Sequence, residues 1–300
     1  MPQAPCVAQA GPARLLHYPG ASHGNPVVFV PSLINPPRVL DLSEERSMLR
    51  RMSAAGHDAY LVDWGAPDVA DGAMDLAAHV TARLVPLLAG FARPPILVGY
   101  CLGGTLALGL AAVREVRAVA TIAAPWRFDA FGSTEREAIA RLWSGAAPTC
   151  ERLGYVPMEV MQSGFWELDP RRTISKYAVF ADAVEGSDDE AAFLAVEDWA
   201  NEGPPLTHAA GRDLFERLYA GNATGAGQWS VDGVVVSETP ENVPTLSIQS
   251  ASDRIVPAAA SPRAAQMLLL QAGHVGMIVG RNGPKLLHEP LSQWLCTHGG

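Results

Sequence analysis

The stretch PILVGYCLGGTLALGLAAV, residues 95–113, decides the fold of this 300-residue chain. Its first six residues are apolar and typical of a buried strand, whereas its last part has the composition of a helix. Between them lies GYCLGG, a Gly-x-nucleophile-x-Gly frame with Cys101 at its centre. The flanking glycines let a strand turn sharply into a helix with no side chain in the way. We therefore predict that Cys101 is a nucleophile on a tight strand-to-helix turn.

Cys101 also has a purely structural explanation, because a free cysteine is usually a small buried core residue. The strand before Cys101 and the helix after it favour the nucleophile instead. The N-terminus of that helix would stabilise a thiolate through its dipole. The backbone N–H of Leu102 would donate to an oxyanion, so Leu102 is our first candidate for an oxyanion hole.

Five further short apolar runs read as buried strands, and helical patterns over residues 43–56 and 73–91 separate some of them. The runs are VVFVP (27–31), AYLVDW (59–64), RAVATIAA (117–124), PTLSIQS (244–250) and MLLLQA (267–272). Strands that alternate with helices predict a parallel sheet covered on both faces. Together with the turn at Cys101, this pattern predicts an α/β-hydrolase fold. The run 267–272 lacks the helix that would ordinarily precede it.

We expect residues 26–300 to form one domain. The interval from about 125 to 230 holds helical patterns but no core strand, so we expect it to form a helical cap inserted over the active face of this domain. The segment QWSVDGVVVS (228–237) follows the cap and predicts a hairpin, since Asp-Gly lies between two β-rich runs. The first 25 residues hold four prolines and three glycines, and we expect an irregular tail there with a single strand near residues 14–18.

Composition excludes several classes of function. A formal charge of −9 and a pI near 5.3 argue against nucleic acid as a partner. Four cysteines without a zinc-like or CxxC spacing fit a reducing compartment, and we expect neither a metal nor a disulfide framework. The sequence has no apolar run near the roughly 20 residues that cross a bilayer. With no signal peptide pattern at the N-terminus, we expect a cytoplasmic protein.

An acyl transfer with Cys101 as nucleophile also needs a general base and an acidic residue that orients this base. In this fold both residues follow the nucleophile along the chain, and the acidic residue comes before the base. Asp253 follows the predicted strand 244–250, and His274 lies between glycines after the run 267–272. An aspartate beside serine more often caps a turn, and that alternative stays open for Asp253. The other seven histidines have no comparable setting and are expected to be surface or packing residues. The sequence thus predicts a Cys101–His274–Asp253 triad.

A second oxyanion donor is expected in the loop PSLINPP, residues 31–37, where the backbone N–H of Leu33 or Ile34 is the candidate. An ordinary proline-bounded connection is equally compatible with that loop. Asp63 ends a predicted strand and is more simply a loop cap. Three tryptophans in or near the cap are candidates for an acyl pocket, with packing as the alternative: Trp126, Trp166 and Trp199.

Seven stretches along residues 26–296 resemble polyhydroxyalkanoate synthases, which polymerise 3-hydroxyacyl-CoA with a cysteine nucleophile. They are VPSLINPPRVLDL (30–42), GHDAYLVDWGAPD (56–68), VGYCLGGTLAL (98–108), FWELDPRRTISKY (165–177), VEDWANEGPP (196–205), PTLSIQSASDRIVP (244–257) and AGHVGMIVG (272–280). The stretch DLFERLYAGN (213–222) looks most similar to the short catalytic subunits of two-component synthases.

The resemblance implies that Cys101 accepts the acyl group, that His274 is the general base, and that Asp253 assists His274 or activates the acceptor hydroxyl. It implies hydroxyacyl-CoA and a growing polyester chain as substrates, no separate cofactor, and a second synthase subunit or a second copy as partner. It also implies a location at the polymer granule surface. Two other functions stay open: a cysteine hydrolase (a thioesterase, esterase or polymer depolymerase), and a silent granule-associated or partner-binding protein.

Overall fold

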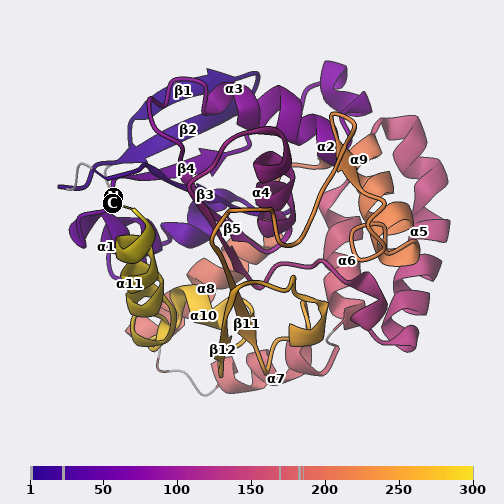
Figure 1. The fold of residues 1–300 in the computed structure, drawn as a ribbon. Coiled ribbons are helices and arrows are strands. Elements are labelled where there is room, and N and C mark those ends of the chain that lie inside the picture. Colours follow the sequence, from indigo (N-terminus) through magenta and orange to yellow (C-terminus); the bar gives the residue numbers. More distant parts are fainter. Residues whose placement is uncertain (1–2, 22–23, 169, 182–183, 185, 300) are drawn as a thin grey trace.

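The computed structural model describes residues 3–21, 24–168, 170–181, 184 and 186–299. An eight-stranded sheet lies at its centre, in the order β1-β2-β4-β3-β5-β6-β11-β12 (Figure 1). The last six strands of this order are all parallel to one another. Strand β2, by contrast, pairs antiparallel with both β1 and β4. The strands are β1 (Cys6–Ala10), β2 (Ala13–Tyr18), β3 (Val27–Val30), β4 (Ala59–Asp63), β5 (Ile96–Tyr100), β6 (Ala118–Ile122), β11 (Thr245–Ser250) and β12 (Gln266–Leu270).

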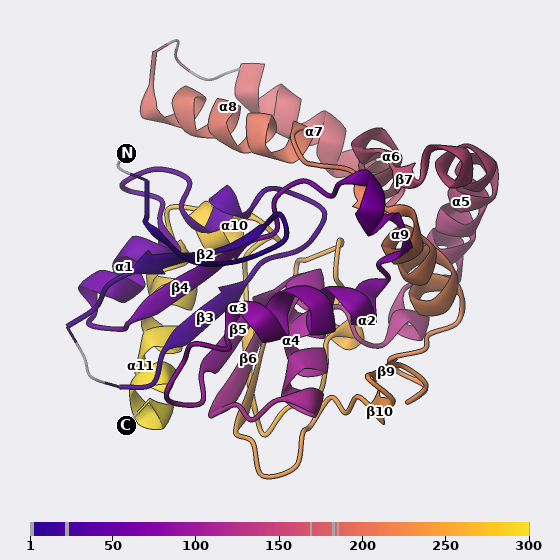
Figure 2. The ribbon, with the colours of Figure 1, turned by 90° about the horizontal axis from the view of Figure 1, so that it is seen from above.

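Helices cover both faces of this sheet (Figures 1 and 2). One face carries α1 (Met48–Ala54), α10 (Gly276–Val279) and the continuous helix formed by η7 (Pro284–His288) and α11 (Glu289–His298). The other face carries α4 (Leu102–Val113) and the helix built from α2 (Leu76–His79), η3 (Val80–Leu84) and α3 (Val85–Leu87). Short 3-10 turns complete the connections: η1 (Pro37–Leu40), η2 (Val69–Ala73), η4 (Phe128–Ala130) and η6 (Ala258–Ala260).

The sequence-based prediction of the fold is confirmed, because all six predicted strands form and lie in one sheet with helices on both faces. Every residue of β3, β5 and β6 is buried. These strands are buried on both faces, which explains why their sequences are continuous apolar runs rather than alternating ones.

The strand expected near residues 14–18 forms as β2, whereas residues 6–10, expected to be irregular, form a second strand. Residues 6–18 form the hairpin β1–β2, which turns at Gly11 with a φ of 61°. Strand β2 buries four of its six side chains and pairs from Arg14 to Tyr18 with the whole of β4. The two strands therefore cover an edge of the sheet that would otherwise expose unpaired backbone groups.

Helices dominate the chain between β6 and β11. They are α5 (Ser133–Leu153), α6 (Met158–Leu168), α7 (Pro170–Ala181), α8 (Asp188–Asn201), α9 (His208–Arg212) and η5 (Asp213–Ala220). Two short pairings accompany them: β7 (Tyr155–Val156) with β8 (Leu206–Thr207), and β9 (Ser230–Val231) with β10 (Val234–Val235). The second pair is the predicted hairpin, with Asp232 and Gly233 both at positive φ. Figure 2 shows α7 and α8 side by side, extending away from the sheet.

Strand β12 is the far edge of the sheet and is covered incompletely. Only the 3-10 turn η6 lies between β11 and β12, as the short interval in the sequence predicts. Met267 and Leu269 of β12 are consequently 66% and 57% exposed, whereas Leu270 at the end of the strand is buried. The strand that leads to His274 is therefore held mainly by its pairing with β11.

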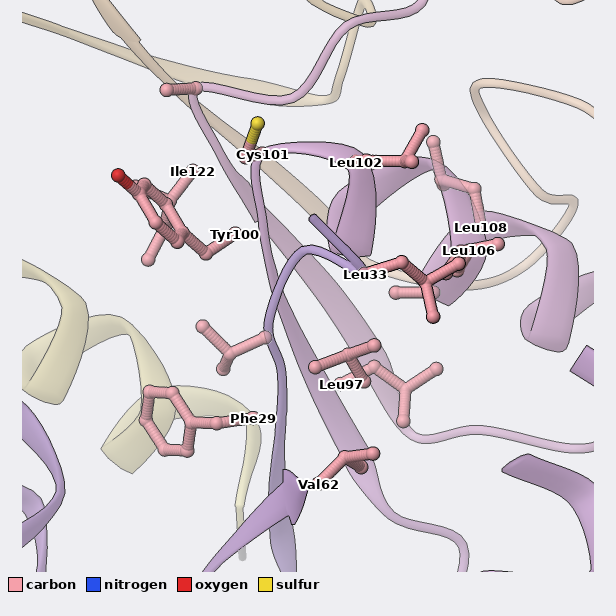
Figure 3. Packing of buried hydrophobic residues seen from close by; sticks show 14 of the residues in the cluster. Phe29, Leu33, Val62, Leu97, Tyr100, Cys101, Leu102, Leu106, Leu108 and Ile122 are labelled. Carbon is pink, nitrogen blue, oxygen red and sulfur yellow. The ribbon is translucent and has the colours of Figure 1, made fainter. Parts of the chain in front are cut away.

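The turn between β5 and α4 depends on close backbone packing. A methyl group built on Gly103 would overlap the carbonyl oxygens of Val30 and Pro31 at the end of β3. One built on Gly99 would overlap the backbone of Gly104 across the turn. Because glycine stands at these positions, helix α4 can start directly against β3 and β5, and Cys101 lies at the point where the chain reverses (Figure 3).

We predict that Gly103→Ala lowers the free energy of unfolding by about 3 kcal/mol or more, because its methyl group has no space beside β3. Urea unfolding of the purified variant followed by circular dichroism measures this loss. The matched control is Gly145→Ala within α5, where an added methyl group meets no atom within 4 Å. That change should raise stability by about 0.5–1 kcal/mol. Equal stability of the two variants would contradict the packing described for the turn.

Candidate active site

Cys101 occupies a strained turn at the carboxyl end of β5. Its φ is 53°, which is a left-handed conformation that non-glycine residues seldom adopt. The backbone N–H of Cys101 donates to Ile122 O at 2.9 Å, and its carbonyl accepts from Gly104 N at 2.8 Å. These bonds fix the turn on both sides, and Figure 3 shows the sulfur at its tip. Such local strain is found preferentially at functional sites.

Asp253 and His274 come from the two loops that follow β11 and β12. His274 Nδ1 lies 2.6 Å from Asp253 Oδ2. Since a carboxylate only accepts hydrogen bonds, Nδ1 carries the proton and Nε2 is the nitrogen left for another partner. Asp253 Oδ1 accepts from the backbone N–H groups of Ile255 and Val256 at 2.8 and 3.1 Å. Asp253 thus caps its loop with one oxygen and bonds the imidazole with the other, and its role as the acid of a triad stays a prediction.

The imidazole of His274 is buried and packed in place. Tyr100 donates from its hydroxyl to His274 O at 3.2 Å, and the two rings lie 5.2 Å apart. Burial by itself lowers the pKa of His274, but the negative charges of Asp253 and Cys101 and the hydrogen bond to Asp253 raise it to about 10. This raised pKa favours the protonated form of the imidazole.

The loop after β3 lies directly against the Cys101 turn. Pro31 and Ser32 line the same cavity as Cys101, and Ile34 lines a second one. The N–H of Ile34 donates to Ser32 Oγ at 3.2 Å. Of the two predicted oxyanion donors, Ile34 is therefore already engaged in a hydrogen bond, and Leu33 is the better candidate. Leu102 is the first residue of α4, where leading N–H groups have no partner within the helix. An oxyanion hole formed by Leu102 and Leu33 stays a prediction.

Two cavities meet at Cys101. The larger has a volume of about 310 Å³ and lies between the sheet and helices α6, α7 and α8 of the cap. His274 and Cys101 both line it, and it reaches the surface beside Trp166, whose exposed fraction is 58%. The smaller has a volume of about 40 Å³ and lies on the other side of Cys101, under α5, α6 and η5.

Polar contacts fasten α8 of the cap to the loop after β3. Trp199 Nε1 donates to Pro36 O at 2.8 Å, and Arg38 Nη1 lies 2.6 Å from Glu202 Oε2. Within the larger cavity, Lys176 of α7 pairs with Glu197 of α8 at 2.7 Å. These contacts hold the roof of the cavity close to the turn that carries Cys101.

Not every candidate residue lies at this site. Trp166 and Trp199 line the larger cavity, whereas Trp126 packs against Trp229 in the core. Asp63 pairs with Arg14 at 2.5 Å and accepts from Gly65 N, so it stabilises the loop after β4. The structure thus shows which of these candidates line the cavity and which have a packing role. The sequence pattern could not make this distinction.

The remaining histidines lie outside the two cavities where the structure describes them. His57 bonds Ser292 Oγ at 2.8 Å, and His288 faces Ile278 O at 3.0 Å. Burial lowers the pKa of both, to about 4 for His288. His23 falls outside the described residues.

Sequence reasoning missed three residues that line the cavities beside Cys101. Lys176, Glu197 and Tyr219 all come from cap helices. Their stretches in the sequence were singled out only for their resemblance to synthases. Helical periodicity alone gives no signal for them, because a cap helix places one side chain in a cavity and its neighbours in solvent.

Within the described part of the chain, no group of three or more His, Cys, Asp or Glu residues has the arrangement of a metal site. The same residues include no helix long and apolar enough to cross a membrane.

Known proteins share both the sequence and the fold. Residues 25–280 match the model of the alpha/beta hydrolase fold family. Poly(3-hydroxyalkanoate) polymerase subunit PhaC of Haloarcula marismortui is 27% identical, and the match covers 94% of this chain and 65% of that protein. The subunit of the same name from Allochromatium vinosum is also 27% identical, with 90% and 80% covered. The predicted resemblance to polyhydroxyalkanoate synthases is thereby confirmed.

The haloarchaeal relatives are longer than this chain. It spans 65% of the Haloarcula protein and 61% of the PhaC subunit from Haloferax mediterranei. Among solved structures, a monoacylglycerol lipase from Paleococcus ferrophilus superposes with a TM-score of 0.62 at 15% identity, covering 96% of this chain and 99% of the lipase. An esterase from Thermogutta terrifontis gives 0.59 at 14% identity, covering 100% and 99%. These two likenesses concern the fold alone.

The raised pKa of His274 predicts a loss of stability at alkaline pH. A protonated imidazole stabilises the folded state fully below its unfolded pKa near 6.5, and this contribution disappears as pH rises through about 10. Urea unfolding of wild type and His274→Gln between pH 6 and pH 10 measures the difference. Wild type should lose stability relative to the variant over this range. His57→Gln is the control, since a lowered histidine pKa gives no alkaline loss. Parallel curves for wild type and His274→Gln would refute the assignment.

Proposed function

Because the chain belongs to the alpha/beta hydrolase fold family, we propose that it is an acyltransferase that polymerises 3-hydroxyacyl-CoA into polyhydroxyalkanoate through an acyl group carried on Cys101. The similarity to polymerase subunits over 94% of the chain supports the reaction. The observation that carries the proposal most is the Asp253–His274 pair beside a cysteine on a strained turn, at the inner end of a largely apolar cavity.

In the first half-reaction, the thiolate of Cys101, whose proton is held at Nε2 of His274, attacks the thioester carbonyl of hydroxyacyl-CoA. A new thioester forms on Cys101, the bond to the CoA sulfur breaks, and cationic His274 gives its Nε2 proton to the leaving thiolate. The N–H groups of Leu102 and Leu33 stabilise the charge on the carbonyl oxygen. Exchange of one thioester for another involves little loss of free energy, and this is why a thiol suits the position better than a hydroxyl.

In the second half-reaction, a 3-hydroxyl of another acyl chain attacks the thioester on Cys101. Neutral His274 accepts the hydroxyl proton at Nε2, an ester bond forms, and the sulfur of Cys101 is released. Asp253 stabilises the imidazolium through its 2.6 Å bond to Nδ1. The cap favours the hydroxyl over water as the acceptor, since it shelters the thioester.

A cysteine hydrolase (a thioesterase, esterase or polymer depolymerase) is the second candidate function. Both functions use the same acyl-enzyme and differ in whether water or a hydroxyl reaches it. The proposal requires no cofactor beyond the CoA thioester. A second subunit or second copy as partner, a cytoplasmic location and attachment to polymer granules stay predictions that follow from the synthase assignment.

The first experiment incubates purified protein with 3-hydroxybutyryl-CoA and follows free CoA and the acyl product together. We expect release of CoA with formation of insoluble polymer. Release of CoA with only free hydroxy acid would identify a thioesterase instead. If the chain alone releases no CoA, the assay is repeated with a second synthase subunit and with polymer as the substrate, and inactivity throughout would refute both functions.

Cys101→Ala should abolish CoA release and leave the fold intact, because a small side chain replaces a small side chain on the same turn. Cys101→Ser should retain at most weak hydrolysis, since a hydroxyl is poorly activated where a thiol is expected. The matched control is Cys296→Ala. Cys296 is an exposed cysteine on α11 and lies far along the chain from the cavities, so this variant should keep full activity. CoA release by Cys101→Ala at the wild-type rate would refute the site.

A further inference from the structure

The small cavity beyond Cys101 differs in chemistry from the larger one. Its lining consists of aliphatic and aromatic side chains together with glycine and proline, and it contains a single side-chain oxygen, the hydroxyl of Tyr219. Its other side-chain heteroatoms are the sulfurs of Cys101 and Met161. One hydroxyl in an otherwise apolar cavity marks a place where a polar group of a ligand would be recognised.

Tyr219 is fixed in position but its hydroxyl has no partner. The ring packs edge-on against Phe128 at 4.9 Å and against Phe131 at 5.2 Å, and Arg136 Nε donates to its backbone carbonyl at 3.1 Å. Among the residues that the structure describes, none forms a hydrogen bond with the Tyr219 hydroxyl. Burial, with the nearby charges of Cys101 and Asp253, raises the pKa of the phenol, so it stays protonated and able to donate.

The size of the cavity limits what it holds. Its volume of about 40 Å³ is near a quarter of the roughly 150 Å³ that accommodates a benzene ring in an engineered protein cavity. That leaves room for one or two groups of the size of a methyl. The third carbon of a 3-hydroxybutyryl group carries two such substituents, a methyl and a hydroxyl.

We infer that this small cavity is the pocket for the acyl group during its transfer to Cys101, and that the Tyr219 hydroxyl hydrogen-bonds the free 3-hydroxyl of a short acyl chain. The inference rests on the proposed function and names its substrate: a 3-hydroxyacyl thioester with a methyl-sized substituent. A hydroxyl buried in this cavity without a partner would be costly, and Tyr219 removes that cost. Tyr219 is thus a specificity residue that distinguishes hydroxyacyl from plain acyl groups.

The test compares 3-hydroxybutyryl-CoA with butyryl-CoA, and measures kcat/KM for CoA release together with the burst of CoA in the first turnover. Wild type should prefer the hydroxyacyl thioester. Tyr219→Phe should reduce that preference by about tenfold, through a loss on 3-hydroxybutyryl-CoA with butyryl-CoA nearly unchanged. The phenylalanine keeps the ring contacts with Phe128 and Phe131, so the fold should remain.

Tyr60→Phe is the matched control, since Tyr60 lies on β4 and bonds Asp58 at 2.9 Å. It should leave the preference unchanged. An equal loss on both thioesters in Tyr219→Phe, or no change in either, would overturn the inference while leaving the proposed function standing. A wild-type protein that releases CoA from neither thioester would instead remove the proposed function, and the inference with it.

A second variant tests the size of the cavity independently of the hydroxyl. Met161→Ala removes a buried side chain from the wall of the small cavity. The ratio of kcat/KM for 3-hydroxyhexanoyl-CoA to that for 3-hydroxybutyryl-CoA should rise by about fivefold or more, since the longer substituent gains space. A ratio equal to that of wild type would overturn the assignment of this cavity to the acyl substituent.

Discussion

The close approach of helix α4 to strands β3 and β5 is the constraint on which the rest of the site depends. Gly103 lets the helix lie against the carbonyl groups of Val30 and Pro31, and this contact places the loop after β3 beside Cys101. The same contact sets Cys101 at a positive φ, with its sulfur beyond the end of the sheet. The positions of Cys101 and of the loop after β3 thus both follow from the absence of side chains at the turn.

Parallel strands supply the remaining geometry. The carboxyl ends of β5, β11 and β12 lie at one edge of the sheet, so the loops after them converge although they are far apart in sequence. This convergence brings Asp253 and His274 within 2.6 Å of each other across 21 positions of the chain. The helices between β6 and β11 cover the site, and two cavities meet there, a larger one that contains the Lys176–Glu197 pair and a smaller apolar one.

Much of this could be predicted from the sequence, and the reasons are local. Buried parallel strands such as β5 are continuous apolar runs, and the order of Cys101, Asp253 and His274 along the chain is a property of the fold. The hairpin β1–β2 could not be predicted in the same way. Its first strand is exposed and its surroundings are rich in proline and glycine, and both features are typical of a loop. The role of Tyr219 depends on which side of η5 meets Cys101, and only the packing of the cap decides that.

The bare edge strand β12 has a consequence for the motions of the molecule. Met267 and Leu269 face solvent, and pairing with β11 is the main attachment of this strand. Elements with few buried contacts open at a lower free energy than the whole protein unfolds. His274 follows β12 by four residues, so fraying of this edge would displace the imidazole while Cys101, between β5 and α4, stays in place. Amide hydrogens of β12 should therefore exchange with solvent sooner than those of β5, and the site would be lost on warming before the sheet itself.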